Sequence, residues 1–373
     1  MWASMYGGLF CFLSLANSAP EQNRTDIGGA GRYNYDMHAA APVSSDFQAL
    51  TDPYRRELLV HSYRFLGSLD DAEDALQEAL LRAWRGLDTL REQGALRPWL
   101  YRIVTNVSLD MLASRKARTM PVLATPSADP HAPLPAPAVT DPLWLEPLPD
   151  DYLAGQDPNP EARYELHESV SLAFLAVLQQ LPGRQRAVLI LRDVLGWKAQ
   201  EVADLLETSV AAVNSALQRA RSTMIEHRLT PGSKGLAASA LASGTPDAAT
   251  AALLKRYVAA WETGDVSRLV DLLRADAILT MPPLTAWYDG RDAIVHFLGS
   301  HLFAGASDGR FRARFTRAND CPAMAVYQAD AGGVFRPASL QVLTLADGVI
   351  ARADCFLTEG EKLFSRFKLP LTA

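Results

Sequence analysis

The distribution of apolar residues divides the chain into stretches with different periods. Between residues 46 and 118, and again between residues 164 and 228, apolar residues recur at helical spacing. The first stretch has little Pro or Gly outside two turns, near Gly67 and near Gly94. Because helical spacing puts the apolar residues on one face, two all-α domains are predicted, with bounds 46–118 and 164–230.

A third pattern runs from Asp247 to the C-terminus. An amphipathic helix is predicted over residues 249–273. The runs AMAVYQAD (323–330) and SLQVLTLADGVIARADCFL (339–357), with Gly-containing turns between them, are typical of strands. Residues 247–373 are therefore expected to form a separate α+β domain.

Two segments between these regions cannot build a core of their own. From Thr119 to Ala162 there are eleven prolines, seven acidic residues and no Lys or Arg, so residues 119–163 are predicted to be an extended acidic linker. Its apolar island PLWLEPLP (142–149) is a candidate for docking on another part of the chain. Residues 231–246 are small and are expected to be a flexible spacer.

The first 45 residues are expected to be a disordered leader or an extension from a misassigned translation start. Residues 1–20 are apolar and uncharged, which is typical of a secretory signal. However, a basic segment before the apolar run is absent, and the run is too short for a membrane span. Met37 is one candidate for the true start.

Composition changes this picture in two ways. The chain has 373 residues, 49% of them hydrophobic, so it can bury two or three cores. Its net charge of −6 excludes a protein coated in basic surface, so contacts with nucleic acid must come from basic residues on particular faces. Three widely spaced cysteines indicate neither a disulfide framework nor a metal site, so no metal or cofactor is expected and a cytoplasmic location is favoured.

Residues 196–224, GWKAQEVADLLETSVAAVNSALQRARSTM, have the outline of a helix-turn-helix. The second helix places Val210, Val213, Leu217, Ala220 and Met224 on one stripe. Its other face is small, polar and basic. Thr208 or Ser209 can cap this helix, and such a helix fits the major groove of DNA. An ordinary helical hairpin in a bundle has the same pattern.

Charge is segregated within residues 46–118. The nine residues from Asp70 to Glu78 include five carboxylates, whereas residues 97–118 have five basic residues against one acid. The second segment also contains Trp99 and Tyr101, and aromatic rings beside arginines are typical of sites that stack on unpaired bases. In the alternative interpretation the rings are core and the acids are a solvated face.

Three segments now carry a family resemblance. They resemble, in this order, the two domains of bacterial sigma factors of the extracytoplasmic-function group. The segments are DAEDALQEALLRAWR (71–85), WLYRIVTNVSLDMLASRKAR (99–118) and LQQLPGRQRAVLILRDVLGWKAQEVADLLETSVAAVNSALQRAR (178–221). The resemblance implies a cytoplasmic binding protein without catalytic turnover. Its partners would be core RNA polymerase and promoter DNA, with no membrane. The acidic linker would suit the basic channel of the polymerase.

The resemblance also assigns roles to residues. The acidic face that grips the coiled coil of the largest polymerase subunit corresponds to Asp71, Glu73, Asp74, Gln77 and Glu78. The minus-ten element would be read by Arg82, Trp99, Tyr101, Arg102 and Asn106, and the loop Leu90 to Ala95 would capture a flipped-out base. The minus-thirty-five element would be read by Asn214, Ser215, Gln218, Arg219 and Arg221. Family members often carry a basic residue at the positions of Asn214 and Ala216, so weaker phosphate contacts are expected here.

Residues 247–373 resemble the cone-shaped SnoaL-like, or nuclear-transport-factor-two-like, fold. The segments that carry this are LLKRYVAAWETGD (253–265), LLRADAILTMPP (272–283) and GRDAIVHFL (290–298). Ketosteroid isomerases share the fold, and Tyr257 falls on their oxyanion-binding tyrosine. Met281 stands where their catalytic Asp is expected, so that chemistry lacks its base. Tyr257, Trp261, Trp287 and Tyr288 are expected either to line a ligand cleft or to belong to the core.

The sequence therefore predicts two all-α sigma domains, the second with a helix-turn-helix, followed by an α+β cone. The predicted function is promoter-directed initiation, regulated in cis by the third domain, on which a small ligand or regulator is a further candidate partner. Two alternatives remain. One is a helix-turn-helix regulator, which would not need the segregated charges of residues 69–118. The other is an enzyme or ligand sensor whose activity lies in residues 247–373.

Overall fold

The computed structural model describes residues 45–90, 95–135, 143–153, 169–229, 248–304, 309–358 and 361–373. The chain divides into two compact units, residues 1–54 and residues 55–373. In the first unit the described residues form the first turns of helix α2 (Ser45–Leu66). All other elements belong to the second unit, and the predicted leader lies almost entirely outside the described residues.

The first helical domain consists of α2, α3 (Leu69–Arg85), the short helix η1 (Leu87–Thr89) and α4 (Leu96–Ser114). Helix α3 begins after Ser68, whose hydroxyl accepts a hydrogen bond from Asp71 N at 3.3 Å. Its buried stripe, which includes Leu69, Leu76 and Leu80, packs against α4. The amphipathic pattern of the sequence thus forms the expected helix.

The second helical domain contains α7 (Leu172–Leu178), α8 (Gly183–Leu189), the π-helical turn η4 (Ile190–Val194), α9 (Ala199–Leu205) and α10 (Val210–Leu229). Helices α9 and α10 form the predicted helix-turn-helix. Glu207 adopts a φ of 51° in the turn, and Ser209 Oγ accepts from Ala212 N at 3.1 Å, which caps α10. Val213, Leu217, Ala220 and Met224 are buried, as the apolar stripe predicts, whereas Val210 at its start is half-buried.

The linker forms short elements that dock on other parts of the chain. After α4 come β1 (Arg118–Thr119) and α5 (Pro121–Ala124), and later β2 (Leu143–Trp144) and η3 (Asp150–Tyr152). Strand β2 pairs in parallel with β1. Leu145 and Leu148 are buried, so the apolar island around them packs as part of a core that other segments supply.

The C-terminal domain is built on a mixed sheet of six strands. These are β3 (Leu273–Thr280), β4 (Trp287–Asp289), β5 (Phe311–Ala318), β6 (Cys321–Ala329), β7 (Phe335–Ala346) and β8 (Val349–Leu357), in the spatial order β4-β3-β8-β7-β6-β5. Among the described strands of this sheet, β3 and β8 pair in parallel and the other neighbours are antiparallel. Because β5 stands last in the spatial order, it is an edge strand.

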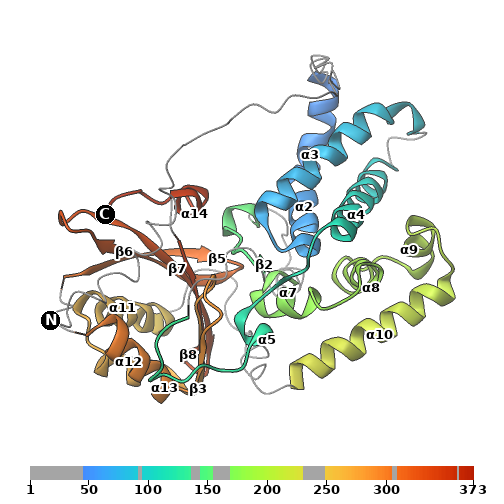
Figure 1. The fold of residues 1–373 in the computed structure, drawn as a ribbon. Helices are drawn as coiled ribbons and strands as arrows, with labels where there is room; N and C mark the ends of the chain where they lie inside the picture. The colour runs from blue at the N-terminus through green and yellow to red at the C-terminus, as the bar shows by residue number, and fades with distance from the viewer. Residues whose placement is uncertain are drawn as a thin grey trace, which may run out of the picture. The chain divides into compact units, whose positions relative to one another are not determined.

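The described residues of this domain also form α-helices and one π-helical turn. They are α11 (Ala248–Thr263), α12 (Ser267–Val270), α13 (Arg291–Phe297), η5 (Leu298–Leu302) and α14 (Glu361–Arg366). Helices α11, α12 and α13 gather on one side of the sheet (Figure 1). With that side they enclose an apolar core that includes Tyr257, Trp261, Phe297 and Met324. The α+β prediction is confirmed. Among the described residues, no helix is long and apolar enough to cross a membrane.

Candidate polymerase and DNA interfaces

The predicted polymerase-binding residues share the exposed side of α3. We call these five residues, Asp71, Glu73, Asp74, Gln77 and Glu78, together with the adjacent Asp70, the carboxylate face. Glu73, Asp74 and Gln77 are exposed, whereas Asp71 and Glu78 are half-buried. Because the opposite side of α3 packs against α4, the carboxylates are directed away from that core.

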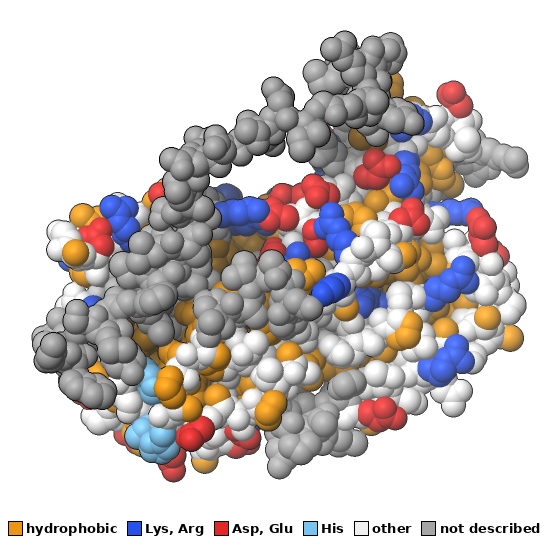
Figure 2. All heavy atoms as spheres, in the orientation of Figure 1, with side chains coloured by type: hydrophobic (Ala, Val, Ile, Leu, Met, Phe, Trp, Pro, Cys, Tyr) orange, Lys and Arg blue, Asp and Glu red, His pale blue; other side chains and the backbone are white. Residues whose placement is uncertain are grey.

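Cations from two distant segments lie on the carboxylate face. Arg118, at the end of the first helical domain, donates to Asp71 Oδ2 at 2.9 Å. Helix α14 of the C-terminal domain supplies Lys362 and Arg366, which both pair with Asp70. Arg366 also lies 3.7 Å from a carboxylate oxygen of Glu73. Acidic and basic side chains crowd together along the upper part of the surface in Figure 2. One end of the carboxylate face is therefore occupied from within the chain.

The linker reinforces this end of α3 through Glu146. One carboxylate oxygen accepts from Ser68 Oγ at 2.9 Å and from Leu69 N at 3.3 Å, so it binds the N-terminus of α3. The other oxygen accepts from Arg118 Nη1 at 3.1 Å. The Glu146 N–H donates to the carbonyl of Gly67, where φ is +68° and a Cβ would lie 2.3 Å from Leu145. The turn between α2 and α3 therefore requires glycine.

The predicted minus-ten residues lie on and beside α4, with different accessibilities. Tyr101 is buried: its ring lies 4.9 Å from the His61 ring and 5.7 Å from the ring of Trp197 of the second helical domain. Tyr101 cannot stack on a base in this arrangement. Trp99 is half-buried and Asn106 is exposed.

The two arginines of the minus-ten set are both in ion pairs. Arg102 donates to Glu207, in the turn of the helix-turn-helix, at 2.8 Å. Arg82 donates to Glu78 at 2.8 Å and to Asp110 at 3.0 Å. These hydrogen bonds raise the pKa of Arg82. Residues 91–94 of the predicted base-capturing loop lie outside the described residues.

The predicted minus-thirty-five residues lie along one accessible side of α10. Asn214, Ser215, Gln218 and Arg219 are exposed, and Arg219 Nη1 donates to Ser215 Oγ at 2.7 Å. Arg221 differs, because both its Nε and Nη2 donate to Asp193, at 2.9 and 2.7 Å. The pairing raises the pKa of Arg221 and fixes its guanidinium against η4.

Asn319, at the tip of the β5–β6 hairpin, joins the C-terminal domain to three parts of the helical half. Its side chain is fully buried, and its φ of 54° is left-handed. Nδ2 donates to Tyr63 Oη at 3.0 Å and to the carbonyl of Val170 at 2.8 Å. Oδ1 accepts from Leu148 N at 2.9 Å, and Asn319 N donates back to Leu148 O at 2.9 Å. We call these four hydrogen bonds the Asn319 junction.

The linker also docks on β4 of the C-terminal domain. Trp287 Nε1 donates to the carbonyl of Thr125 at 2.7 Å, and Ala128 N donates to Trp287 O at 2.8 Å. Thr125 Oγ1 donates to Thr285 O at 2.8 Å. Trp287 therefore binds the linker, whereas Tyr257, Trp261 and Tyr288 belong to the apolar core, so the four aromatics do not line one cleft.

The interior of the cone is packed with side chains. Tyr257 donates to Gln341 Oε1 at 2.8 Å, and burial raises the pKa of Tyr257. The ring of Trp261 makes edge-on contacts with Phe303 and Phe311, with centroids 5.3 and 5.9 Å apart. Tyr288 stacks on Phe297 at 4.3 Å. Met281 is buried in the same core. Among the described residues, no group of His, Cys, Asp or Glu is arranged to hold a metal.

Sequence reasoning missed Glu146, Asn319, Lys362 and Arg366. One signal was present for the last two: α14 carries basic residues at spacing i, i+4, which places them on one face of a helix. Glu146 and Asn319 act across 28 to 256 positions of sequence, and no local pattern reports such contacts.

Comparison with protein families agrees with this architecture. Residues 50–118 match Sigma-70 region 2, residues 171–224 match Sigma-70 region 4, and residues 254–353 match the SnoaL-like domain. The first match covers α3 and α4, and the second covers the helix-turn-helix.

Similar proteins align over most of the chain. The chain is 47% identical to the ECF RNA polymerase sigma factor SigG of Mycobacterium tuberculosis over 87% of this chain and 84% of the relative. It is 31% identical to SigJ of the same organism over 68% of this chain and 71% of the relative. The crystal structure of SigJ superposes with a TM-score of 0.52 at 25% identity, covering 88% of this chain and 99% of SigJ. The chain belongs to the extracytoplasmic-function RNA polymerase sigma factors that carry a C-terminal SnoaL-like domain.

Proposed function

We propose that this sigma factor engages core polymerase through the carboxylate face of α3. The observation that carries this proposal is the presence of exposed Glu73, Asp74 and Gln77 opposite the buried stripe of the helix. A row of carboxylates on a rigid helix complements a basic helical surface such as the proposed coiled coil of the largest polymerase subunit. No catalytic step is assigned, since Met281 supplies no base.

The proposed promoter contacts divide between two helices. Asn214, Ser215, Gln218 and Arg219 on α10 are accessible to the minus-thirty-five element, and their donors and acceptors suit base edges and phosphates. On α4, Asn106 and Trp99 are the accessible candidates for the minus-ten element. Arg102 can contact the minus-ten element only after its ion pair with Glu207 breaks. Tyr101 can contact it only after its ring separates from the ring of Trp197.

These occupied contacts support regulation in cis by the C-terminal domain. Lys362 and Arg366 neutralise Asp70 at one end of the carboxylate face, and the Asn319 junction ties both helical domains and the linker to the β5–β6 hairpin. Polymerase and α14 would compete for the same carboxylates. The arrangement is therefore a closed state that lowers the apparent affinity for polymerase.

Run-off transcription with purified core polymerase tests this function. The double variant Asp74→Lys, Glu78→Lys should lose polymerase binding and promoter-dependent transcripts while it keeps the wild-type thermal transition. A matched control, Asp289→Lys with Asp292→Lys, makes the same charge change at exposed positions of β4 and α13 and should retain activity. Equal polymerase affinity in the two double variants would reject the role assigned to α3.

A further inference from the structure

A groove lies where the linker, the C-terminal domain and the chain end meet. Its volume is about 520 Å³, within the range of small-molecule sites. Its walls come from Pro149–Asp151 of the linker, Leu254 and Lys255 of α11, Phe315–Arg317 of β5, and Phe367 after α14. This groove lies outside the packed interior of the cone. It is therefore a candidate ligand site that differs from the interior of the cone and has no assigned role.

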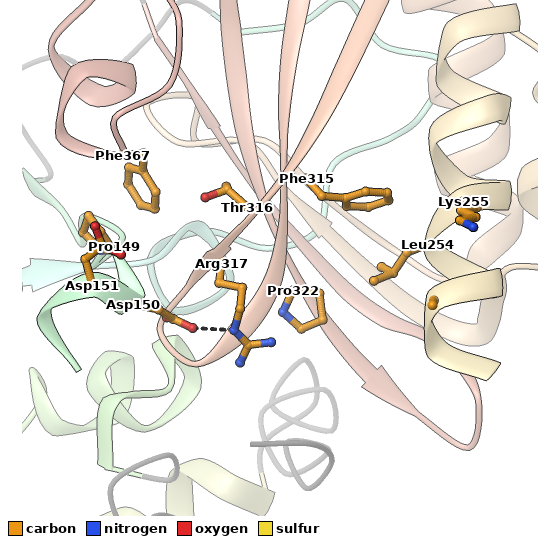
Figure 3. A pocket seen from close by; sticks show the side chains of 11 residues that line it. Pro149, Asp150, Asp151, Leu254, Lys255, Phe315, Thr316, Arg317, Pro322 and Phe367 are labelled. Carbon is orange, nitrogen blue, oxygen red and sulfur yellow. Dashed lines mark hydrogen bonds and ion pairs between the residues drawn. The ribbon is translucent and has the colours of Figure 1, made fainter. Parts of the chain in front are cut away.

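The floor of the groove is apolar and includes an exposed aromatic ring. Phe315 is 44% exposed, although its strand belongs to a well-packed sheet. Figure 3 shows Phe315 pointing toward Leu254 and Lys255, with Phe367 on the opposite side. Covering an exposed ring in a concave apolar site with the apolar part of a ligand is favourable, because it removes apolar surface from water.

A peptide strand is a poor fit for this site even though β5 is an edge strand. Ala313 N already donates to Glu262 Oε1 at 3.2 Å, and Asn319 N donates to Leu148 O at 2.9 Å. These contacts block the edge on both sides of Phe315. Since Pro149 also bridges to Ala318, residues 314–317 are the part of the edge that stays open, near the lower limit of usual strand lengths, which are about 3 to 10 residues. A small molecule therefore fits better than an added strand.

The charges in the groove indicate which small molecule. Arg317 is paired with Asp150 and with Asp320, both at 2.7 Å, and Asp151 is paired with Lys368 at 2.6 Å. Lys255 makes no ion pair with any residue that the structure describes. Figure 3 places Lys255 across the groove from Asp150 and Asp151. Arg317 carries one positive charge against two carboxylates, so the linker side of the groove is acidic and its positive side is at Lys255 on α11.

We propose that this groove binds an amphipathic organic acid, with its carboxylate at Lys255 and its apolar body over Phe315, Leu254 and Phe367. The inference rests on the proposed regulation in cis, because the groove exists only while the linker lies against β5. A ligand that contacts both walls binds the closed state better than any open state. It must therefore stabilise the closed state and repress transcription.

Calorimetric titration of the full-length protein with decanoate tests the site. Saturable binding with one site per chain is expected, and decylammonium, which has the same tail and the opposite charge, should not bind. Lys255→Gln should weaken decanoate binding by about tenfold, as expected for loss of one charge-assisted contact, and Phe315→Ser should weaken it similarly. Arg256→Gln, a neighbouring exposed position of α11 outside the groove, is the matched control.

The outcomes separate this inference from the proposed function. Absence of saturable binding up to about 1 mM decanoate, or binding that neither variant changes, would overturn the site. Binding that depends on Phe315 but not on Lys255 would overturn the acid class. Decanoate that binds but does not lower run-off transcription would overturn the coupling. Failure of the proposed function looks different, because transcripts would then be absent with and without decanoate.

Discussion

The Asn319 junction can be tested by replacing Asn319 with glycine. This substitution removes the side chain but keeps the left-handed φ of 54° accessible, so the hairpin turn remains unstrained. The Asn319 N–H can still donate to Leu148 O. What is lost are the three side-chain hydrogen bonds to Tyr63, Val170 and Leu148.

The expected size of the effect follows from those three bonds. Each is buried and contributes about 0.5 to 1.5 kcal/mol net, so the closed state should lose about 2 to 4 kcal/mol. Water that enters the vacated space would satisfy part of the exposed donors and acceptors, which favours the lower value. A loss of about 2 kcal/mol changes the ratio of closed to open molecules by roughly 30-fold. The apparent affinity for core polymerase should increase by up to that factor.

Fluorescence anisotropy with labelled protein and core polymerase measures this affinity directly. Asp347→Gly is a matched control, because Asp347 also has a left-handed φ, of 52°, but lies exposed in the β7–β8 turn. It introduces the same glycine flexibility into the unfolded chain without touching the helical half. If Asn319→Gly and Asp347→Gly bound polymerase with the same affinity as wild type, within about twofold, the junction would not limit opening and the reasoning would fail.

Three further predictions concern other contacts. Lys362→Ala with Arg366→Ala should increase polymerase affinity by about fivefold, because the two ion pairs with Asp70 together contribute about 1 kcal/mol. At about 0.5 M salt, the difference in affinity between this variant and the wild type should disappear. Arg219→Ala should weaken use of the minus-thirty-five element by about 1 to 3 kcal/mol in run-off competition between promoters, and Arg221→Ala should cost less because Asp193 already engages that side chain. Burial, with Arg64 nearby, lowers the pKa of His61 to about 3, so below pH 6.5 the unfolded chain binds a proton at His61 that the folded protein does not bind. The free energy of unfolding, measured with urea, should therefore fall by about 2 kcal/mol between pH 7.5 and pH 5, and His61→Gln should reduce that fall.

Periodicity predicted the helices on which the proposed interfaces lie. The stripe of α10 and the charged side of α3 follow from residues three and four positions apart, which share a helix face whatever the rest of the chain does. Strands follow a different rule. Trp287 and Tyr288 are neighbours on strand β4, and neighbouring side chains of a strand point to opposite sides of the sheet, so Trp287 meets the linker while Tyr288 lies in the core.

Other features had no local signal. The burial of Tyr101 depends on Trp197, 96 positions away in the sequence, and nothing around Tyr101 distinguishes a ring that stacks on DNA from one that packs on another domain. Asn319 looks like an ordinary hairpin residue, since asparagine is common at left-handed positions. Its junction exists because Tyr63, Leu148 and Val170 arrive from three separate segments.

Under the regulation in cis proposed above, the attachment of α14 to the same polypeptide as α3 would fix the stoichiometry of inhibition. A tethered group faces its target at an effective concentration in the millimolar range, so ion pairs too weak to capture a separate protein are strong enough within one chain. Each copy of the factor is synthesised with its own inhibitory helix, so the ratio of inhibitor to factor stays at one when synthesis increases. Weak contacts also part quickly, which lets such a factor respond without degradation of an antagonist.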